Sequence, residues 1–483
     1  MGSPQSNARR VAVVGGGISG LAAAHRLIEL DPACQLTLYE RRSRLGGALW
    51  TKHEEGYQVE QGVDNFITTL PWGLDLCRRL GLEDQLVQTN PKLRQTYVVR
   101  AGRLHKLPDG FLMMAPTRMW PLVVTPILSP LGKLRCGLEY FLPPRKHDAD
   151  ESVASFVRRR LGREAYERLV EPLVSAVYAA DLEKLSIEAT LSRFRQMERD
   201  HGSIVRAMRK QMKKRRGEGQ SGGGESGPRF SMFVTLREGL SSLVDAITDR
   251  LPEGAARPAT VVERIERHDG GWRVWATQSG AGDSPPPESE DFDALIMAAP
   301  SHIAADLLRT HDAELADDLA TITHSGTAIL SFAFDREQIS HPLDGMGIVV
   351  PGIEKSPILA CSLSSQKYVH RAPEGKVLLR VFVGGMRYPE MAEMAEDELR
   401  PRVLDELAQL LGIDGPPIYS GLARWPRTMP QYHVGHKDLV ERIETRAAAL
   451  PDFALCGNAY HGVGIPDCVH TAEQAAERII NKQ

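Results

Sequence analysis

The pattern of apolar and polar positions begins with a strand, a turn and a helix. Residues 11–14, VAVV, form an apolar run of strand length, a glycine turn follows, and apolar residues recur at helical spacing from Ser19 to Leu30. A second strand, QLTLYE, ends at Glu40. A helix that connects two parallel strands is typical of α/β proteins, so we expect a Rossmann-type nucleotide-binding domain here.

The periodicity changes in the middle of the chain. Residues 71–212 contain repeated amphipathic stretches and are predicted to be mainly helical, with one strand pair in TYVVRAGRLHKLP. Residues 213–229 are rich in glycine and charge and predict a flexible surface loop. The strand-like runs TAILSFAF, GMGIVV and VLLRVFVGG predict an antiparallel substrate-binding sheet within residues 311–425.

Two later segments return the chain to the first domain. FVTLREGLSSLVDAITDRL predicts a turn and a helix, and DALIMAAP is an apolar run of the kind buried in a parallel sheet. The end of the chain predicts a strand, a loop and a helix. The expected division is nucleotide binding in 1–70, 230–310 and 426–483, the helical domain in 71–212, the loop in 213–229 and the substrate sheet in 311–425.

Length and composition narrow the class of protein. The 483 residues exceed the roughly 250–300 that one hydrophobic core supports, so we expect two or three domains. The 59 basic and 62 acidic residues nearly balance, which argues against a nucleic-acid partner. Six scattered cysteines show no metal-ligand spacing, and the start of the chain lacks a signal-peptide pattern, so we expect no metal and a cytoplasmic location.

One apolar segment needs a separate interpretation. MWPLVVTPILSPLGKL, residues 119–134, contains three prolines and is too short to span a bilayer. We expect a buried helix-and-loop lid. The alternative is a surface patch that touches a membrane or a partner.

The glycines after the first strand have the spacing of a dinucleotide site. In GxGxxG, Gly15 allows the tight turn, Gly17 lets a pyrophosphate approach the backbone, and Gly20 lets helix and strand pack closely. Glu40 stands twenty residues beyond Gly20, where its carboxylate can bind the ribose hydroxyls. The predicted phosphate turn comprises Gly15, Gly16, Gly17, Ile18, Ser19 and Gly20.

The residues that follow distinguish FAD from NAD. The segment ERRSRLGG, with Glu40, Arg44 and Gly47, resembles the E-x-x-x-R-x-G-G segment of the FAD amine-oxidase superfamily. That family usually has Arg after the two glycines, whereas Ala48 stands here, so one contact is absent or comes from elsewhere. EQGVDNF, VVERIE and CGNAYHGVGIPDC are similar to other flavin-facing segments of the family. The resemblance implies further FAD contacts from Arg41, Gly62, Val63, Asp64, Asn65, Val262, Trp425, Val463, Gly464 and Ile465.

Four more segments indicate the reaction. DESVASFVRRRLG, EPLVSAVYAADLEKLSIEATLSRF, LLRVFVGG and RWPRTMPQYHVGH together resemble the oxygen-dependent porphyrinogen oxidases of haem synthesis over almost the whole chain. The resemblance implies a six-electron oxidation of a porphyrinogen by FAD, with O₂ as acceptor and hydrogen peroxide as product. We assign no catalytic side chain, because the flavin accepts the hydride. The alternatives are a flavin amine oxidase or desaturase, and a scaffold whose FAD is structural.

The resemblance also implies a substrate slot. Met346, Gly347, Val349 and Phe382 match family positions that touch the substrate, although each also suits an ordinary core. Protoporphyrinogen oxidases have a propionate-binding Arg where Thr96 stands here, so we expect coproporphyrinogen III as substrate and protoporphyrinogen IX as the alternative. A slip in register would let Arg94 or Arg100 take that role. Association with a membrane, with the next haem-pathway enzyme or as a homodimer stays open.

Overall fold

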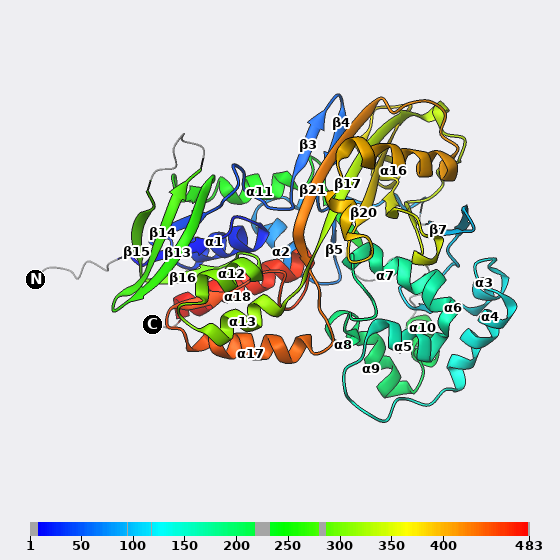
Figure 1. Ribbon diagram of the computed structural model, residues 1–483, viewed down its shortest axis with the longest axis horizontal. Helices are drawn as coiled ribbons and strands as arrows, with labels where there is room; N and C mark the ends of the chain where they lie inside the picture. The colour runs from blue at the N-terminus through cyan, green and yellow to red at the C-terminus, as the bar shows by residue number, and fades with distance from the viewer. Residues whose placement is uncertain (1–7, 94, 117, 218–231, 280–285, 482–483) are drawn as a thin grey trace, which may run out of the picture.

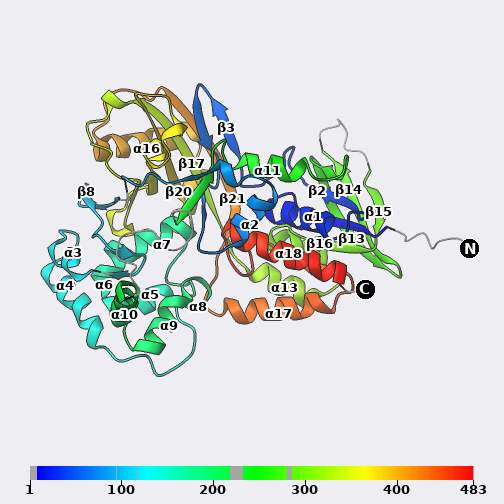
Figure 2. The same ribbon diagram turned by 180° about the vertical axis from the view of Figure 1, so that it is seen from behind.

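Two large sheets form the framework of the molecule, and a helical lobe packs against the second sheet (Figure 1). The computed structural model describes residues 8–93, 95–116, 118–217, 232–279 and 286–481. The first and the last described segments, β1 (Arg10–Val14) and α18 (Ile465–Asn481), both belong to the part of the molecule around the first sheet, far from the helical lobe, as the reverse view also shows (Figure 2). The chain therefore leaves the nucleotide-binding part and returns to it.

The first sheet is wholly parallel, as the sequence predicted. Residues of β1 alternate between two cores: Val11 and Val13 enter the core on one face, and Ala12 and Val14 enter the other. A strand buried on both faces needs an unbroken apolar run, which explains VAVV. The strand order is β12 (Ala256–Arg257), β2 (Gln35–Tyr39), β1 (Arg10–Val14), β16 (Ala294–Met297), β22 (Phe453–Leu455).

Helices and a small antiparallel sheet cover the two faces. The core on one side contains residues of α1 (Ile18–Leu30), α11 (Ser241–Thr248) and α18 (Ile465–Asn481). The other face is covered by the strands β13 (Thr260–His268), β14 (Gly271–Gln278) and β15 (Glu288–Phe292), and by the helices α12 (Ser301–Leu308), α13 (Ala313–Thr321) and α17 (His436–Ala449).

The second sheet has seven strands and is mostly antiparallel. The strand pair predicted in TYVVRAGRLHKLP comprises β7 and β8, residues 96–100 and 103–106. It joins this sheet instead of the helical domain, because β7 pairs in parallel with β18, residues 347–349. The strand order is β21 (Tyr419–Pro430), β17 (His324–Asp335), β20 (Lys376–Gly384), β19 (Ile358–Ser362), β18 (Gly347–Val349), β7 (Thr96–Arg100), β8 (Arg103–Lys106).

The two faces of this sheet have different neighbours. Tyr97 and Val99 enter a core with α16 (Glu396–Leu411), whereas Val98, Val349 and Phe382 face the helical lobe. Around the sheet lie β3 (Thr51–Glu54), β4 (Tyr57–Glu60), η4 (Arg336–Gln338), η5 (Gly352–Glu354), α14 (Ser364–Lys367), η6 (Val369–Arg371) and α15 (Pro389–Glu393).

The helical lobe and the strand that follows it differ from two local expectations. Helix α10 runs beyond residue 212, and residues 218–229 of the expected loop lie outside the described ranges. The expected turn after that loop is the strand β11.

The lobe contains β9 (Phe111–Leu112), β10 (Ala115–Pro116), α3 (Met119–Val124), α4 (Pro130–Gly137), η2 (Leu138–Phe141), α5 (Val153–Leu161), α6 (Arg163–Ala165), η3 (Tyr166–Val170), α7 (Glu171–Tyr178), α8 (Ile187–Thr190), α9 (Ser192–His201) and α10 (Ile204–Gly217). The elements between the two sheets are β5 (Phe66–Ile67), α2 (Trp72–Arg79), η1 (Glu83–Gln85), β6 (Leu86–Gln88) and β11 (Phe233–Leu236).

The expectation of a buried lid at residues 119–134 is wrong. Trp120 is 73% exposed and Leu131 is 78% exposed. The short helices α3 and α4 turn only a few residues inward, among them Leu122 and Cys136, because the prolines interrupt the apolar periodicity. Within the described ranges, no helix is both long enough and apolar enough to cross a membrane.

Candidate cofactor and substrate site

The GxGxxG turn lies at the carboxyl end of β1 and leads directly into α1. The backbone N–H of Gly15 donates to the carbonyl of Tyr39 at 2.8 Å, so the turn is held beside β2. No side chain caps the start of α1, and no acidic residue lies in its first turn. Uncapped N–H groups at a helix start favour an anion such as a pyrophosphate.

The glycines of this turn have different roles. A Cβ on Gly15 or Gly20 would meet backbone atoms, at 2.8 Å from Ala298 O and at 1.7 Å from Gly15 O. A Cβ on Gly16 would lie 2.7 Å from the Glu40 side chain. A Cβ on Gly17 would meet no protein atom within 4 Å. The protein therefore requires the other glycines for its own packing, whereas the open space at Gly17 fits a ligand phosphate.

Glu40 lies at the position expected for the ribose. It is buried, and its carboxylate accepts hydrogen bonds from the backbone N–H groups of Gly16, at 2.8 Å, and Arg42, at 2.7 Å. The carbonyl of Glu40 accepts from the N–H of Thr260, which begins the strand that carries Val262. The structure thus brings the predicted ribose and adenine segments together.

The second glycine pair contacts the first. The N–H of Gly46 donates to the carbonyl of Gly16 at 2.8 Å, and a Cβ on Gly47 would lie 3.2 Å from Gly17 Cα. Ala48, where the family usually has Arg, uses its backbone: its carbonyl accepts from the N–H of Val63 at 3.0 Å. The predicted flavin loop is therefore held directly against the phosphate segment.

Trp425 connects this region to the second sheet. Its indole N–H donates to the carbonyl of Gln61 at 2.7 Å, and the guanidinium of Arg42 lies 4.9 Å from its ring centre. Arg44 lies 4.4 Å from the ring of Trp50, and burial, followed by repulsion from Arg42, lowers its pKa to about 10. Within the described residues, the Arg44 guanidinium donates to the carbonyls of Leu45 and Gly47 and not to a carboxylate, which leaves a cation for a diphosphate. Arg41 is exposed beside this segment.

The C-terminal segment supplies a second helix start. Val463 and Gly464 precede α18, which begins at Ile465 and packs along α1. Gly457, which follows β22, was not selected from the sequence. It has a φ of +137°, and a Cβ there would meet nothing within 4 Å, as at Gly17. The signal that could have found it is the glycine directly after the last parallel strand.

The predicted substrate residues gather on one region of the second sheet. Thr96 pairs with Gly347, and the N–H of Met346 donates to the carbonyl of Gln95 at 2.8 Å. Val349 lies in the core of the helical lobe, and Phe382 and Val463 pack against that core. The slot residues therefore share an apolar region with one end of the predicted flavin site.

The register bears on one of the two candidate cations. Arg100 lies at the far end of β7 and pairs with Arg103. It stands four positions along the strand from Thr96, about 13 Å away, so it does not replace a cation there. Arg94 lies outside the described residues.

The PQYHVGH segment is a structural junction. The ring of Tyr432 stacks on His436 at 4.0 Å between centroids, and its hydroxyl donates to the carbonyl of Asn458. The carbonyl of Tyr432 accepts from Ser186 N–H, and the N–H of Gly435 donates to Asp150 at 3.1 Å. These contacts attach the helical lobe to the nucleotide-binding part.

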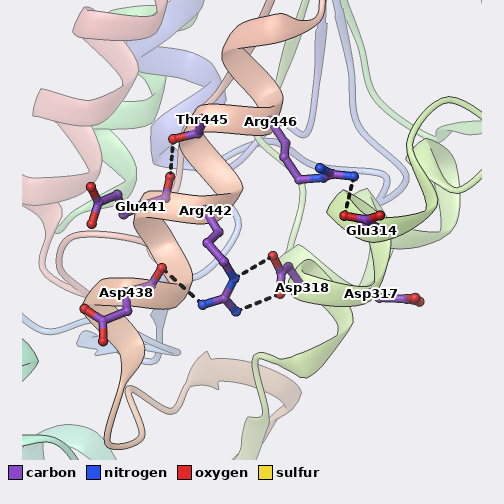
Figure 3. A pocket seen from close by; sticks show the side chains of 8 residues that line it. All are labelled: Glu314, Asp317, Asp318, Asp438, Glu441, Arg442, Thr445 and Arg446. Carbon is purple, nitrogen blue, oxygen red and sulfur yellow. Dashed lines mark hydrogen bonds and ion pairs between the residues drawn. The ribbon is translucent and has the colours of Figure 1, made fainter.

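Other groups with reactive potential lie apart from the cradle. Figure 3 shows a hollow between α13 and α17 where Arg442 pairs with Asp318 and Arg446 with Glu314, so both of its arginines are paired with carboxylates. All six cysteines are buried free thiols. Across the described ranges, no three metal-ligating side chains gather.

Comparison with known proteins identifies the family. The profile described as flavin containing amine oxidoreductase matches residues 18–480. The chain belongs to this family. It is a flavin-dependent oxidoreductase whose cofactor is FAD, and the open cradle at Gly17, the helix start and Arg44 fit that cofactor.

Relatives of similar length have named activities. The coproporphyrinogen III oxidase of Bacillus subtilis is 34% identical, covering 97% of each chain. That of Propionibacterium freudenreichii is 34% identical over 99% of this chain and 92% of its own. Protoporphyrinogen oxidase 1 of Arabidopsis thaliana is 29% identical over 97% and 87%.

Solved structures agree with the fold. A crystal structure from Exiguobacterium sp. 255-15, assigned provisionally as a protoporphyrinogen oxidase, superposes with a TM-score of 0.85 at 30% identity, over 98% of this chain and 99% of that chain. A reduced UDP-galactopyranose mutase has a TM-score of 0.71 at 16% identity, over 98% and 96%, which indicates a shared fold alone.

Proposed function

We propose that this protein oxidises coproporphyrinogen III to coproporphyrin III. The reaction removes six electrons and six protons in three two-electron steps and reduces three O₂ to three hydrogen peroxide. Bound FAD supplies the electron acceptor. The chain holds the macrocycle in the apolar slot of Val349 and Phe382 and excludes water from it.

The observation that carries the choice of substrate is the neutral side chain of Thr96. It stands beside Gly347 at the edge of the slot, where the protoporphyrinogen oxidases that the chain resembles have an Arg. The register places Arg100 too far away to replace that cation. The relatives at 34% identity are named coproporphyrinogen III oxidases, which supports the same choice.

The test is a porphyrin fluorescence assay with each porphyrinogen. We expect a higher kcat/KM with coproporphyrinogen III than with protoporphyrinogen IX, and one peroxide for each electron pair. A preference for protoporphyrinogen IX would contradict the substrate assignment. Anaerobic bleaching of the flavin by an amine but not by a porphyrinogen would favour an amine oxidase, and no bleaching with either would favour a structural FAD.

We further propose that the helical lobe rests on an anionic membrane surface. Its apolar patch consists of side chains exposed between 46% and 78%, and Arg206 and Arg209 lie over the ring of Tyr140 at its border. Apolar side chains bordered by cations suit an anionic lipid interface. The patch comprises Trp120, Val123, Val124, Leu131, Leu134, Leu138 and Phe141.

Vesicle co-sedimentation tests this association. We expect binding to vesicles that contain phosphatidylserine, weaker binding to pure phosphatidylcholine, and loss of binding in the double variant Trp120→Ser, Phe141→Ser. Val369→Ser is the matched control, because Val369 is 71% exposed outside the patch. Dimerisation through the patch, without binding to vesicles, would contradict the proposal.

A further inference from the structure

A buried group of charges lies behind the predicted flavin loop. We call it the Asp64 cluster: Glu60, Asp64, Lys367, Arg371 and Arg380. Asp64 Oδ2 lies 2.8 Å from Lys367 Nζ, and Asp64 Oδ1 pairs with Arg371 and lies 3.1 Å from Arg380. The side chains of Glu60, Arg371 and Arg380 are fully buried.

The cluster holds the loop through its backbone. Arg380 donates to the carbonyl of Gly62 at 2.7 Å, and Arg371 donates to the carbonyl of Asp64 at 3.0 Å. Residues 62–65 are themselves only half-buried, so one side of the loop faces open space and the other faces the closed cluster. The loop therefore separates the cations from that open space.

Positive charge exceeds negative charge in the cluster. Three cations face two carboxylates. Burial alone would raise the pKa of Asp64, but Arg371, Lys367 and Arg380 hold it well below its ordinary value. Burial raises the pKa of Glu60 despite Arg371, and it lowers the pKa of Lys367 and of Arg380 despite Asp64.

Arg380 is buried with only part of its hydrogen-bonding capacity used. Its Nε has no hydrogen-bond acceptor among the residues that the structure describes, and one terminal nitrogen lies 3.1 Å from Asp64 Oδ1 as an ion pair without hydrogen-bond geometry. Its guanidinium carbon lies 5.3 Å from the ring centre of Phe382, the predicted slot residue. A cation in a dry interior, in a cluster with more cations than carboxylates, acts over a longer distance than one in water, because solvent does not screen it.

We propose that Arg380 is a positioning residue that raises the reduction potential of the flavin. This inference rests on the proposed site, with the ring along the open side of the loop. A bound flavin that accepts a hydride, two electrons and one proton, would gain one negative charge, and the second hydrogen of each substrate step would depart as a proton. A cation behind the loop stabilises that charged form and favours reduction of the ring.

The test measures the potential of the FAD-loaded protein against reference dyes, with dithionite as reductant and no porphyrinogen present. Arg380→Gln should lower the two-electron reduction constant about tenfold, equivalent to about 30 mV, for a unit charge acting within about 10 Å. Arg380→Lys should keep most of the wild-type potential. Asp64→Asn, which removes a negative charge, should shift the potential in the opposite direction.

Arg424→Gln is the matched control. Arg424 donates to the carbonyls of Ala392 and Met394 and pairs with Ala328, whose side chain lies in the core of the opposite face. A structural role alone would lower the melting temperature of both Arg→Gln variants without moving the potential. An unchanged potential in Arg380→Gln overturns the inference. This holds even if KM for the porphyrinogen rises, because that result would make Arg380 a ligand of a substrate propionate. The measurement does not depend on the identity of the substrate, so failure of the substrate assignment leaves it intact.

Discussion

The nucleotide cradle and the substrate slot use the chain in different ways. The cradle is built from backbone: the helix start after Gly17, the bond from Gly46 to Gly16, and the Ala48 carbonyl that holds Val63. The slot is built from side chains on strands far apart in sequence, such as Thr96 and Phe382. Backbone sites require glycines at fixed spacing, whereas an apolar slot accepts ordinary core residues.

The largest expected effect concerns the cradle. Gly17→Val should abolish FAD binding while the protein stays folded, because the new side chain enters ligand space, where its Cβ meets no protein atom within 4 Å. Flavin absorbance per mole of protein and the circular dichroism melting curve measure the two results. Gly137→Val in α4 is the control, since a Cβ there also meets nothing within 4 Å. A variant that keeps its full FAD would place the phosphate elsewhere.

A second glycine tests the same difference between a position used for the ligand and a position used for packing. Gly20→Ala should prevent folding itself, because its Cβ would lie 1.7 Å from the carbonyl oxygen of Gly15. The yield of soluble protein and its melting curve are the measurements. If Gly20→Ala folds normally and only loses FAD, the two glycines do not differ in role as the structure indicates.

The next effect concerns the slot. Thr96→Arg should move the ratio of kcat/KM toward protoporphyrinogen IX by about one to two decades, since one charge-assisted contact is worth about 1.5–3 kcal/mol. Porphyrin fluorescence with both substrates measures the ratio. Thr96→Lys, at the same position, tests whether charge suffices without the planar guanidinium. An unchanged ratio in both variants would remove Thr96 from the slot.

The last prediction concerns the junction between the helical lobe and the nucleotide-binding part. Burial lowers the pKa of His436 from 6.5 to about 4. Between pH 6.5 and pH 4 the unfolded chain therefore binds a proton that the folded protein does not, and up to about 3 kcal/mol of stability is lost as pH falls through that range. His436→Gln should flatten this dependence in urea unfolding, and the exposed His147→Gln should not. Equal slopes in all three proteins would contradict the buried neutral imidazole.

Predictability from the sequence follows the same division. The strand, turn and helix around Gly15 and the strand DALIMAAP could be predicted, because local spacing determines them. The exposure of Trp120 could not, since three prolines conceal which side of each short helix faces inward. The Asp64 cluster could not either: its residues lie in two segments separated by some 300 positions, and neither segment shows unusual charge.

The six buried thiols have a consequence for the lifetime of the enzyme. The proposed reaction would release peroxide in every flavin cycle and would expose the cysteines to an oxidant that attacks the thiolate. Burial raises the pKa of Cys468 to about 12 and that of Cys34 to about 11. These cysteines stay protonated and enclosed while peroxide leaves, so the fold protects the catalyst from inactivation by its own product.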